Sequence, residues 1–212
     1  YDEWKYSVYA QNDIQCQDCH MVPVEIANRV ADEMKPPEEL NEPALEGFVG
    51  LGGPWRKVVH KHGFVGGNAV ITAVLNGELA ESDNPEDLGR GSNYEEAVKR
   101  LQSVASLKLN VSRQDGPLHR VKVKVTNDRA GHHLPTSLTE VREVWLEVVV
   151  TDDQGRELLR NGSLDAHNHL PPDTVVFNSH AVDKDGNHTH FPWEIVRFST
   201  RNTIPPKGYK YG

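Results

Sequence analysis

Cys16, Cys19 and His20 form a Cys-x-x-Cys-His motif, which includes both cysteines of the chain. This motif is typical of covalent attachment of a c-type haem. Two thiols one helical turn apart can each add to a vinyl group of one porphyrin, while the adjoining imidazole coordinates the iron. A cysteine pair alone would also fit zinc, a redox dithiol or a disulfide, but zinc needs further ligands. The motif therefore predicts one haem c per chain, attached through Cys16 and Cys19, with His20 as proximal ligand.

The ligand on the other side of the iron decides what such a haem does. A sixth protein ligand favours electron transfer, whereas an open position allows chemistry at the metal. Met21 follows the proximal ligand directly and cannot reach the opposite face, so Met34 is the single thioether candidate in the sequence. Ten histidines besides His20 offer imidazole nitrogens. The residues alone leave the sixth position open between Met34 and a histidine.

Three groups of residues follow one another along the chain. They are Glu3-Trp4, Ser7 and Tyr9-Ala10 ahead of Cys-x-x-Cys-His-Met; His62-x-Phe64-x-Gly66-Gly67-Asn68; and Gly131-His132-x-Leu134-Pro135-Thr136 followed by Arg142-Glu143-x-Trp145-Leu146. In this order and spacing they resemble a family of multihaem c-type cytochromes from bacteria. In that family the last group opens a β-sandwich, so the resemblance implies a sandwich in the second half of this chain.

The resemblance also implies that His62 or His132 ligates a haem. We expect His62 to be the distal ligand of this haem, because it lies in the same half of the sequence as Cys16. The glycines that follow it would let the backbone pass close to a porphyrin. His132 is the alternative distal ligand, or a ligand of another haem. Either residue could instead be an ordinary hydrogen-bonded loop histidine.

The chain departs from this family in one respect. Family members carry several Cys-x-x-Cys-His motifs, and this sequence has one. Its start inside a family-like segment leads us to expect a fragment or an unusually short member. A spare motif histidine could then serve a haem in a missing segment or in a neighbouring chain. We expect a redox protein as partner, for example another multihaem cytochrome chain. We also expect that further copies of this chain can assemble with it as an oligomer.

The spacing of apolar residues changes from helical to alternating along the sequence. Residues 68–80 are predicted to form a short helix, and Ser92 with Glu95 forms a capping box that predicts the start of a longer one. After Asp115-Gly116-Pro117, valines alternate with basic residues from Arg120 onwards, as in a half-buried strand. This change of period places a domain boundary near residues 110–117.

Further alternating or β-branched segments predict an all-β second half. Strands are expected at residues 144–150, 174–178 and 194–199, with a hairpin turn at residues 183–187. The sequence therefore predicts the α+β class. We expect a helical and loop-rich haem c domain over residues 1–112 and an antiparallel β-sandwich-like domain over residues 113–212.

The composition is that of a globular protein with a formal net charge of −8, which makes nucleic acid an unlikely partner. No apolar run approaches the roughly eighteen residues that a membrane-spanning helix needs. The chain begins at Tyr1 without a signal-peptide pattern, so we expect any signal to have been removed or to lie upstream. Since c-type haems are attached in the periplasm or its equivalents, we expect a periplasmic or extracellular protein.

The sequence is compatible with three classes of function. Electron transfer through a six-coordinate, bis-His haem is the leading hypothesis, in which case the protein is not an enzyme. A haem enzyme acting on peroxide or a small nitrogen oxide would need an open iron and a distal acid or base such as His60. An interaction module of a larger multihaem complex is the third.

Histidine pairs such as His167 with His169 and His188 with His190 could also hold zinc or copper, or be exposed strand residues.

Overall fold

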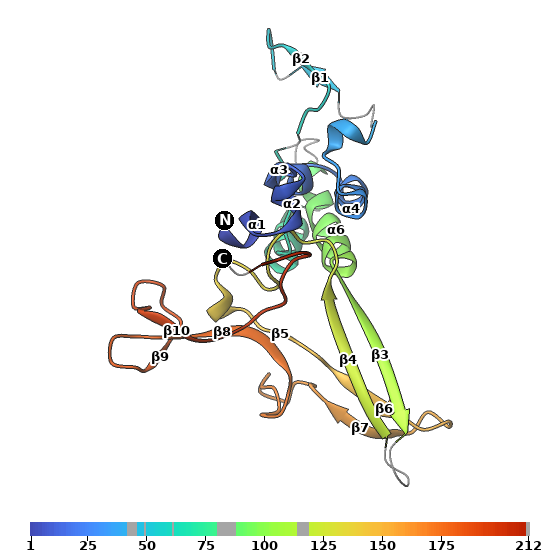
Figure 1. Ribbon diagram of the computed structural model, residues 1–212, viewed down its shortest axis with the longest axis vertical. Coiled ribbons are helices and arrows are strands. Elements are labelled where there is room, and N and C mark those ends of the chain that lie inside the picture. Colours follow the sequence, from blue (N-terminus) through green and yellow to red (C-terminus); the bar gives the residue numbers. More distant parts are fainter. Residues whose placement is uncertain (42–45, 49, 61, 80–87, 114–118, 211–212) are drawn as a thin grey trace. The chain divides into compact units, whose positions relative to one another are not determined.

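The computed structural model divides the chain into two compact units (Figure 1). Residues 1–132 and 206–212 form the first unit, and residues 133–205 form the second. The structure describes residues 1–41, 46–48, 50–60, 62–79, 88–113 and 119–210. Helices and antiparallel strands are both present, so the predicted α+β class is confirmed. No helix among the described residues is long and apolar enough to span a membrane.

The first unit contains most of the helices. Its elements are α1 Asp2–Lys5, α2 Val8–Gln11, α3 Cys16–His20, α4 Val24–Glu33, the 3-10 helix η1 Pro37–Glu39, β1 Gly47–Phe48, β2 Trp55–Arg56, α5 Ala69–Leu79, α6 Leu88–Ser103, β3 Ala105–Arg113 and β4 His119–Asn127. The chain returns at its C-terminal end, where the amide of Val8 donates to the carbonyl of Lys207 (3.1 Å) and that of Lys210 donates to Tyr6 (3.2 Å). The predicted helix over residues 68–80 is confirmed by α5, and residue 80 lies outside the described residues.

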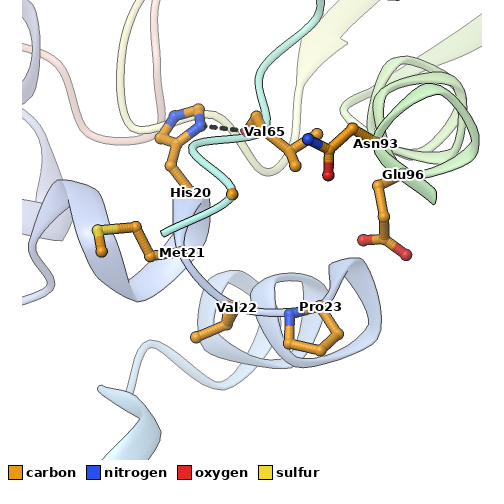
Figure 2. A pocket seen from close by; sticks show the side chains of 8 residues that line it. His20, Met21, Val22, Pro23, Val65, Asn93 and Glu96 are labelled. Carbon is orange, nitrogen blue, oxygen red and sulfur yellow. Dashed lines mark hydrogen bonds between the residues drawn. The ribbon is translucent and has the colours of Figure 1, made fainter. Parts of the chain in front are cut away.

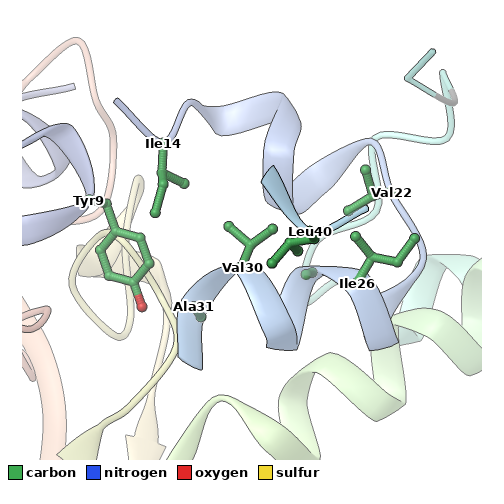
Figure 3. Packing of buried hydrophobic residues seen from close by; sticks show 8 residues of the cluster. Tyr9, Ile14, Val22, Ile26, Val30, Ala31 and Leu40 are labelled. Carbon is green, nitrogen blue, oxygen red and sulfur yellow. The ribbon is translucent and has the colours of Figure 1, made fainter. Parts of the chain in front are cut away.

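The hydrophobic core of this unit forms where α4 packs against the segments on either side of it (Figure 3). Apolar residues recur on α4 at three- and four-residue spacing, which gives the helix one buried face. The cluster consists of Tyr9, Ile14, Val22, Ile26, Ala27, Val30, Ala31 and Leu40. Helix α4 ends at Glu33, and the next residue, Met34, has a left-handed backbone (φ 53°). Pro36 and Pro37 follow, and proline cannot continue a helix. The core includes Ile14 and Val22, which lie on either side of α3 in the sequence, and Cys19 of α3 packs against it. The core therefore supports α3.

One prediction about the end of the helical region needs correction. Helix α6 begins at Leu88, so Ser92 lies inside it and the helix start that we predicted there is wrong. A capping residue contributes only about 1 kcal/mol, which packing between helices can outweigh. The predicted boundary after residue 112 falls within β3, which pairs with β4 in one antiparallel hairpin of the first unit. The predicted linker Asp115-Gly116-Pro117 lies outside the described residues.

The second unit is built from short antiparallel strands. They are β5 Val144–Trp145, β6 Val148–Thr151, β7 Glu157–Asn161, β8 Val176–Val182, β9 His188–Thr189 and β10 Arg197–Asn202, with the 3-10 helix η3 Thr139–Val141 before them. Strand β8 pairs with β10, β5 and β9, whereas β6 pairs with β7. The single strand expected at residues 144–150 is therefore two strands with different partners. The predicted sandwich arrangement of these sheets stays a prediction.

Candidate haem site

The Cys-x-x-Cys-His motif forms the short helix α3, and a buried carboxylate holds its N-terminal end. The backbone N–H of Gln15 donates to Oδ2 of Asp18 at 2.7 Å, as in the capping of a first helical turn. The other carboxylate oxygen of Asp18, Oδ1, lies 3.1 Å from Nε2 of His60. Asp18 is only 5% exposed, so both contacts are made away from bulk water. The two cysteines are thereby presented from a helix whose start is fixed.

Arg100 of helix α6 holds the other end of α3. Its guanidinium donates from Nη1 to the carbonyl of Cys19 (2.7 Å) and from Nη2 to the carbonyl of Val22 (2.6 Å). These are carbonyls at or just beyond the end of a helix, where a cation also interacts favourably with the helix dipole. Desolvation lowers the pKa of Arg100, which is the expected effect of burying a charged group. The motif helix is therefore clamped at both ends by charged side chains.

His20, the expected proximal ligand, is oriented by the backbone of a loop far along the sequence (Figure 2). Nδ1 of His20 lies 2.7 Å from the carbonyl oxygen of Val65, and the N–H of Val65 donates to the carbonyl of His20 at 3.1 Å. Since a carbonyl can only accept, Nδ1 carries the proton. The second ring nitrogen, Nε2, is then the one that can bind a metal. A ring N–H held by a backbone carbonyl is the usual arrangement of a metal-ligating histidine.

The ring of His132 lies opposite the ring of His20. Their centroids are 6.1 Å apart and their planes differ by 14°. One pocket joins both rings to the two cysteines. It is lined by Trp4, Tyr9, Ile14, Gln15, Cys16, Cys19, His20, Gly131 and His132. The structure therefore brings together four of the five residues that the sequence singled out.

The loop before His132 is held by contacts with nearby and distant residues. The side chain of Asn127 donates from Nδ2 to the carbonyl of His132 (2.8 Å) and accepts from the N–H of Ala130 at 2.9 Å. A Cβ atom on Gly131 would lie 3.3 Å from the Tyr9 ring and 3.5 Å from the Trp4 ring. Glycine thus lets this loop pass closely over two aromatic side chains. No sequence pattern had pointed to Asn127.

The residue that we expected to be the distal ligand, His62, lies elsewhere. It is exposed and its ring stacks on that of Phe64, with centroids 5.8 Å apart. It is not among the described residues that line the pocket with the cysteines. Met34 packs against the hydrophobic core and is not among those lining residues either. His62 as distal ligand stays a prediction, and this geometry favours His132 instead.

Burial sets the reactivity of the second cysteine. Desolvation, followed by the charge of Asp18, raises the pKa of the Cys19 thiol to about 12. Cys16 is exposed. Because a thiolate is the nucleophile, we expect iodoacetamide to modify Cys16 much faster than Cys19 in haem-free protein at pH 8. Peptide mass spectrometry measures both rates, and protein with attached haem should react at neither residue.

The same pKa shift predicts a pH dependence of stability. A cysteine thiol in the unfolded chain has a pKa of about 8.5, so Cys19 loses its proton less readily in the folded state than in the unfolded state. The stability of haem-free protein is therefore unaffected by this thiol below that pH and falls as pH rises towards 12. A Cys19→Ala variant should lack this part of the alkaline loss, as measured by urea unfolding. Equal alkylation rates at the two cysteines in folded protein would contradict the burial argument.

No protein-family model, curated protein or solved structure matches this chain.

Proposed function

We propose that this chain is a c-type cytochrome that carries one covalently attached haem and transfers electrons. Cys16 and Cys19 would form the thioether links, His20 would be the proximal ligand and His132 the distal ligand. The observation that carries this proposal is the pairing of the His20 and His132 rings across a pocket that both cysteines line. His62 would not be a ligand of this haem.

The spacing of the two rings fits two ligands of one metal ion. A coordinating imidazole nitrogen lies about 2 Å from its metal, and the ring centre lies roughly 1 Å further out, so two opposed rings have centroids about 6 Å apart. The observed separation of 6.1 Å agrees with this value. The hydrogen bond between His20 and Val65 supports the same assignment, because it leaves Nε2 of His20 for the metal.

The other lining residues suit a porphyrin. Trp4, Tyr9 and Ile14 offer apolar surface to the macrocycle, and the Trp4 indole is held in place because its Nε1 donates to the carbonyl of Ile14 at 2.8 Å. The Tyr9 hydroxyl lies 3.4 Å from the carbonyl of Asp128, so its polar end is directed to the backbone. A bound haem would supply a one-electron iron couple in this pocket.

Two histidine ligands favour electron transfer over the enzymatic alternative. A haem enzyme needs an open iron position and a nearby acid or base. His60, which we considered for that role, contacts the buried Asp18 and is not among the described residues that line the pocket. We therefore propose that the protein acts with a redox partner, such as another multihaem cytochrome chain or a further copy of itself. A periplasmic or extracellular location follows from where haem c is attached.

Spectroscopy of the protein produced in a host that attaches haem c tests this proposal. We expect one haem per chain by the pyridine haemochrome assay, and haem that stays with the chain in a denaturing gel. The ferric spectrum should be low spin without a sulfur-to-iron band, and the ferrous protein should bind carbon monoxide poorly. A high-spin ferric haem that readily binds cyanide would support the enzymatic alternative. Chain without covalent haem would refute the proposal.

A further inference from the structure

Three exposed histidines meet on the hairpin of β8 and β9 in the second unit. His180 comes from β8, His188 begins β9 and His190 follows it. In the hairpin register Val182 opposes His188 and Ala181 opposes Thr189. Since residues two apart share a face of a strand, the three histidines project from the same face. The sequence alone indicated only the pair His188 and His190. His180 lies near them because β8 pairs with β9, which the spacing of residues does not reveal.

Two of these rings already have the spacing of metal ligands. Nδ1 of His180 lies 3.4 Å from Nε2 of His188. Two nitrogens bound to one tetrahedral metal ion at about 2.0–2.1 Å are separated by roughly 3.4 Å. As a hydrogen bond the same contact is long, since the usual N···acceptor distance is about 2.9–3.0 Å. The geometry thus matches a shared metal better than a direct bond between the rings.

The third histidine, His190, has one ring nitrogen available to a metal but is not yet placed with the other two. Nδ1 of His190 lies 2.7 Å from the backbone carbonyl of Glu140, so Nδ1 carries the proton and Nε2 is the nitrogen available to a metal. The His188 and His190 ring centroids are 4.5 Å apart at an interplanar angle of 87°. In their present positions, no group of three or more His, Cys, Asp or Glu side chains among the described residues could hold a metal ion. His190 must therefore rotate to join the first two nitrogens.

The hairpin gives these ligands a firm support. In the turn between β8 and β9, Oδ1 of Asp183 accepts from the N–H groups of Asp185 and Asn187, each at 2.9 Å. These hydrogen bonds fix the turn that joins the strand of His180 to the strand of His188.

We propose that His180 and His188 bind one divalent transition-metal ion of the Zn²⁺ class, with His190 as the third protein ligand. Imidazole nitrogen suits Zn²⁺ and Cu²⁺, whereas Ca²⁺ and Mg²⁺ prefer oxygen ligands. Water would complete the coordination, because the three side chains are exposed. This site is separate from the Cys-x-x-Cys-His pocket, and its existence does not depend on the proposed haem.

Calorimetric titration of the chelator-treated, otherwise intact protein with ZnCl₂ tests the proposal. We expect one site per chain with a dissociation constant of roughly micromolar order. His180→Ala and His188→Ala should each weaken binding at least about tenfold, and His190→Ala should weaken it by a smaller factor. CaCl₂ should give no binding heat at this site. Far-UV circular dichroism checks that each variant keeps its fold.

The pair His167 and His169 provides a matched control. These residues are also exposed and two apart, but their ring centroids lie 6.2 Å from each other. The double variant H167A/H169A should bind zinc as tightly as the unmodified protein. The proposal is overturned if the unmodified protein binds no zinc, or if the control variant loses as much affinity as H180A or H188A. Electron paramagnetic resonance of bound Cu²⁺ gives a second test, since fewer than two coordinated nitrogens would also overturn it.

Discussion

Replacing His132 by alanine is expected to convert the proposed haem, in its ferric state, from low spin to high spin. The substitution removes the imidazole whose ring lies 6.1 Å from that of His20, and leaves only water to occupy the sixth position. Ferrous protein should then bind carbon monoxide readily. Absorption and electron paramagnetic resonance spectra measure the change of spin state. Added imidazole should restore the low-spin spectrum, because it can enter the space that the side chain leaves.

His62→Ala is the matched control for this experiment. His62 belongs to the same unit, but it is exposed and stacked on Phe64 rather than placed beside His20. We expect the H62A variant to keep the low-spin spectrum and the reduction potential of the unmodified protein. A high-spin haem in H62A together with an unchanged spectrum in H132A would show that His62 is the ligand, as the sequence had led us to expect.

Replacing Arg100 by methionine is expected to lower the free energy of unfolding by about 2–4 kcal/mol, because two hydrogen bonds from a charged donor are lost. Methionine keeps much of the apolar stem but leaves the carbonyls of Cys19 and Val22 without their donor. Haem attachment should fall as well, since helix α3 loses the contact that fixes its C-terminal end. Urea unfolding followed by circular dichroism measures the stability, and a haem stain measures the attachment.

The neighbouring Lys99 gives a control on the same helix. Its side chain is half exposed and lies 3.5 Å from Glu25, so Lys99→Met should cost no more than about 1 kcal/mol. Arg100→Lys should recover part of the loss, because an ammonium keeps the charge but cannot span both carbonyls with a planar fork. Equal stability of the R100M and K99M variants would contradict the role that we assign to Arg100.

Local sequence patterns were sufficient where the determining residues are neighbours along the chain. The alternation of valines from Arg120 onwards predicted β4, and the apolar residues of 68–80 predicted α5. The same reasoning was wrong for residues 144–150. There the first part pairs with β8 and the second with β7, and Nε1 of Trp145 donates to the carbonyl of Gly162. A period-two pattern does not say which strand will be the partner, so it could not reveal this break.

The sequence by itself determined the Cys-x-x-Cys-His motif, because its chemistry depends on residues within one helical turn. The tertiary structure decided which histidine lies opposite His20. Val65 and His132 come from parts of the chain that are distant from His20 in sequence. Val65 is hydrogen-bonded to His20, and His132 follows a glycine that packs on aromatic rings. His180 likewise joins His188 only because β8 and β9 pair. Contacts between residues that are distant in sequence depend on loop closure and packing, and the spacing of residues along the chain does not predict them.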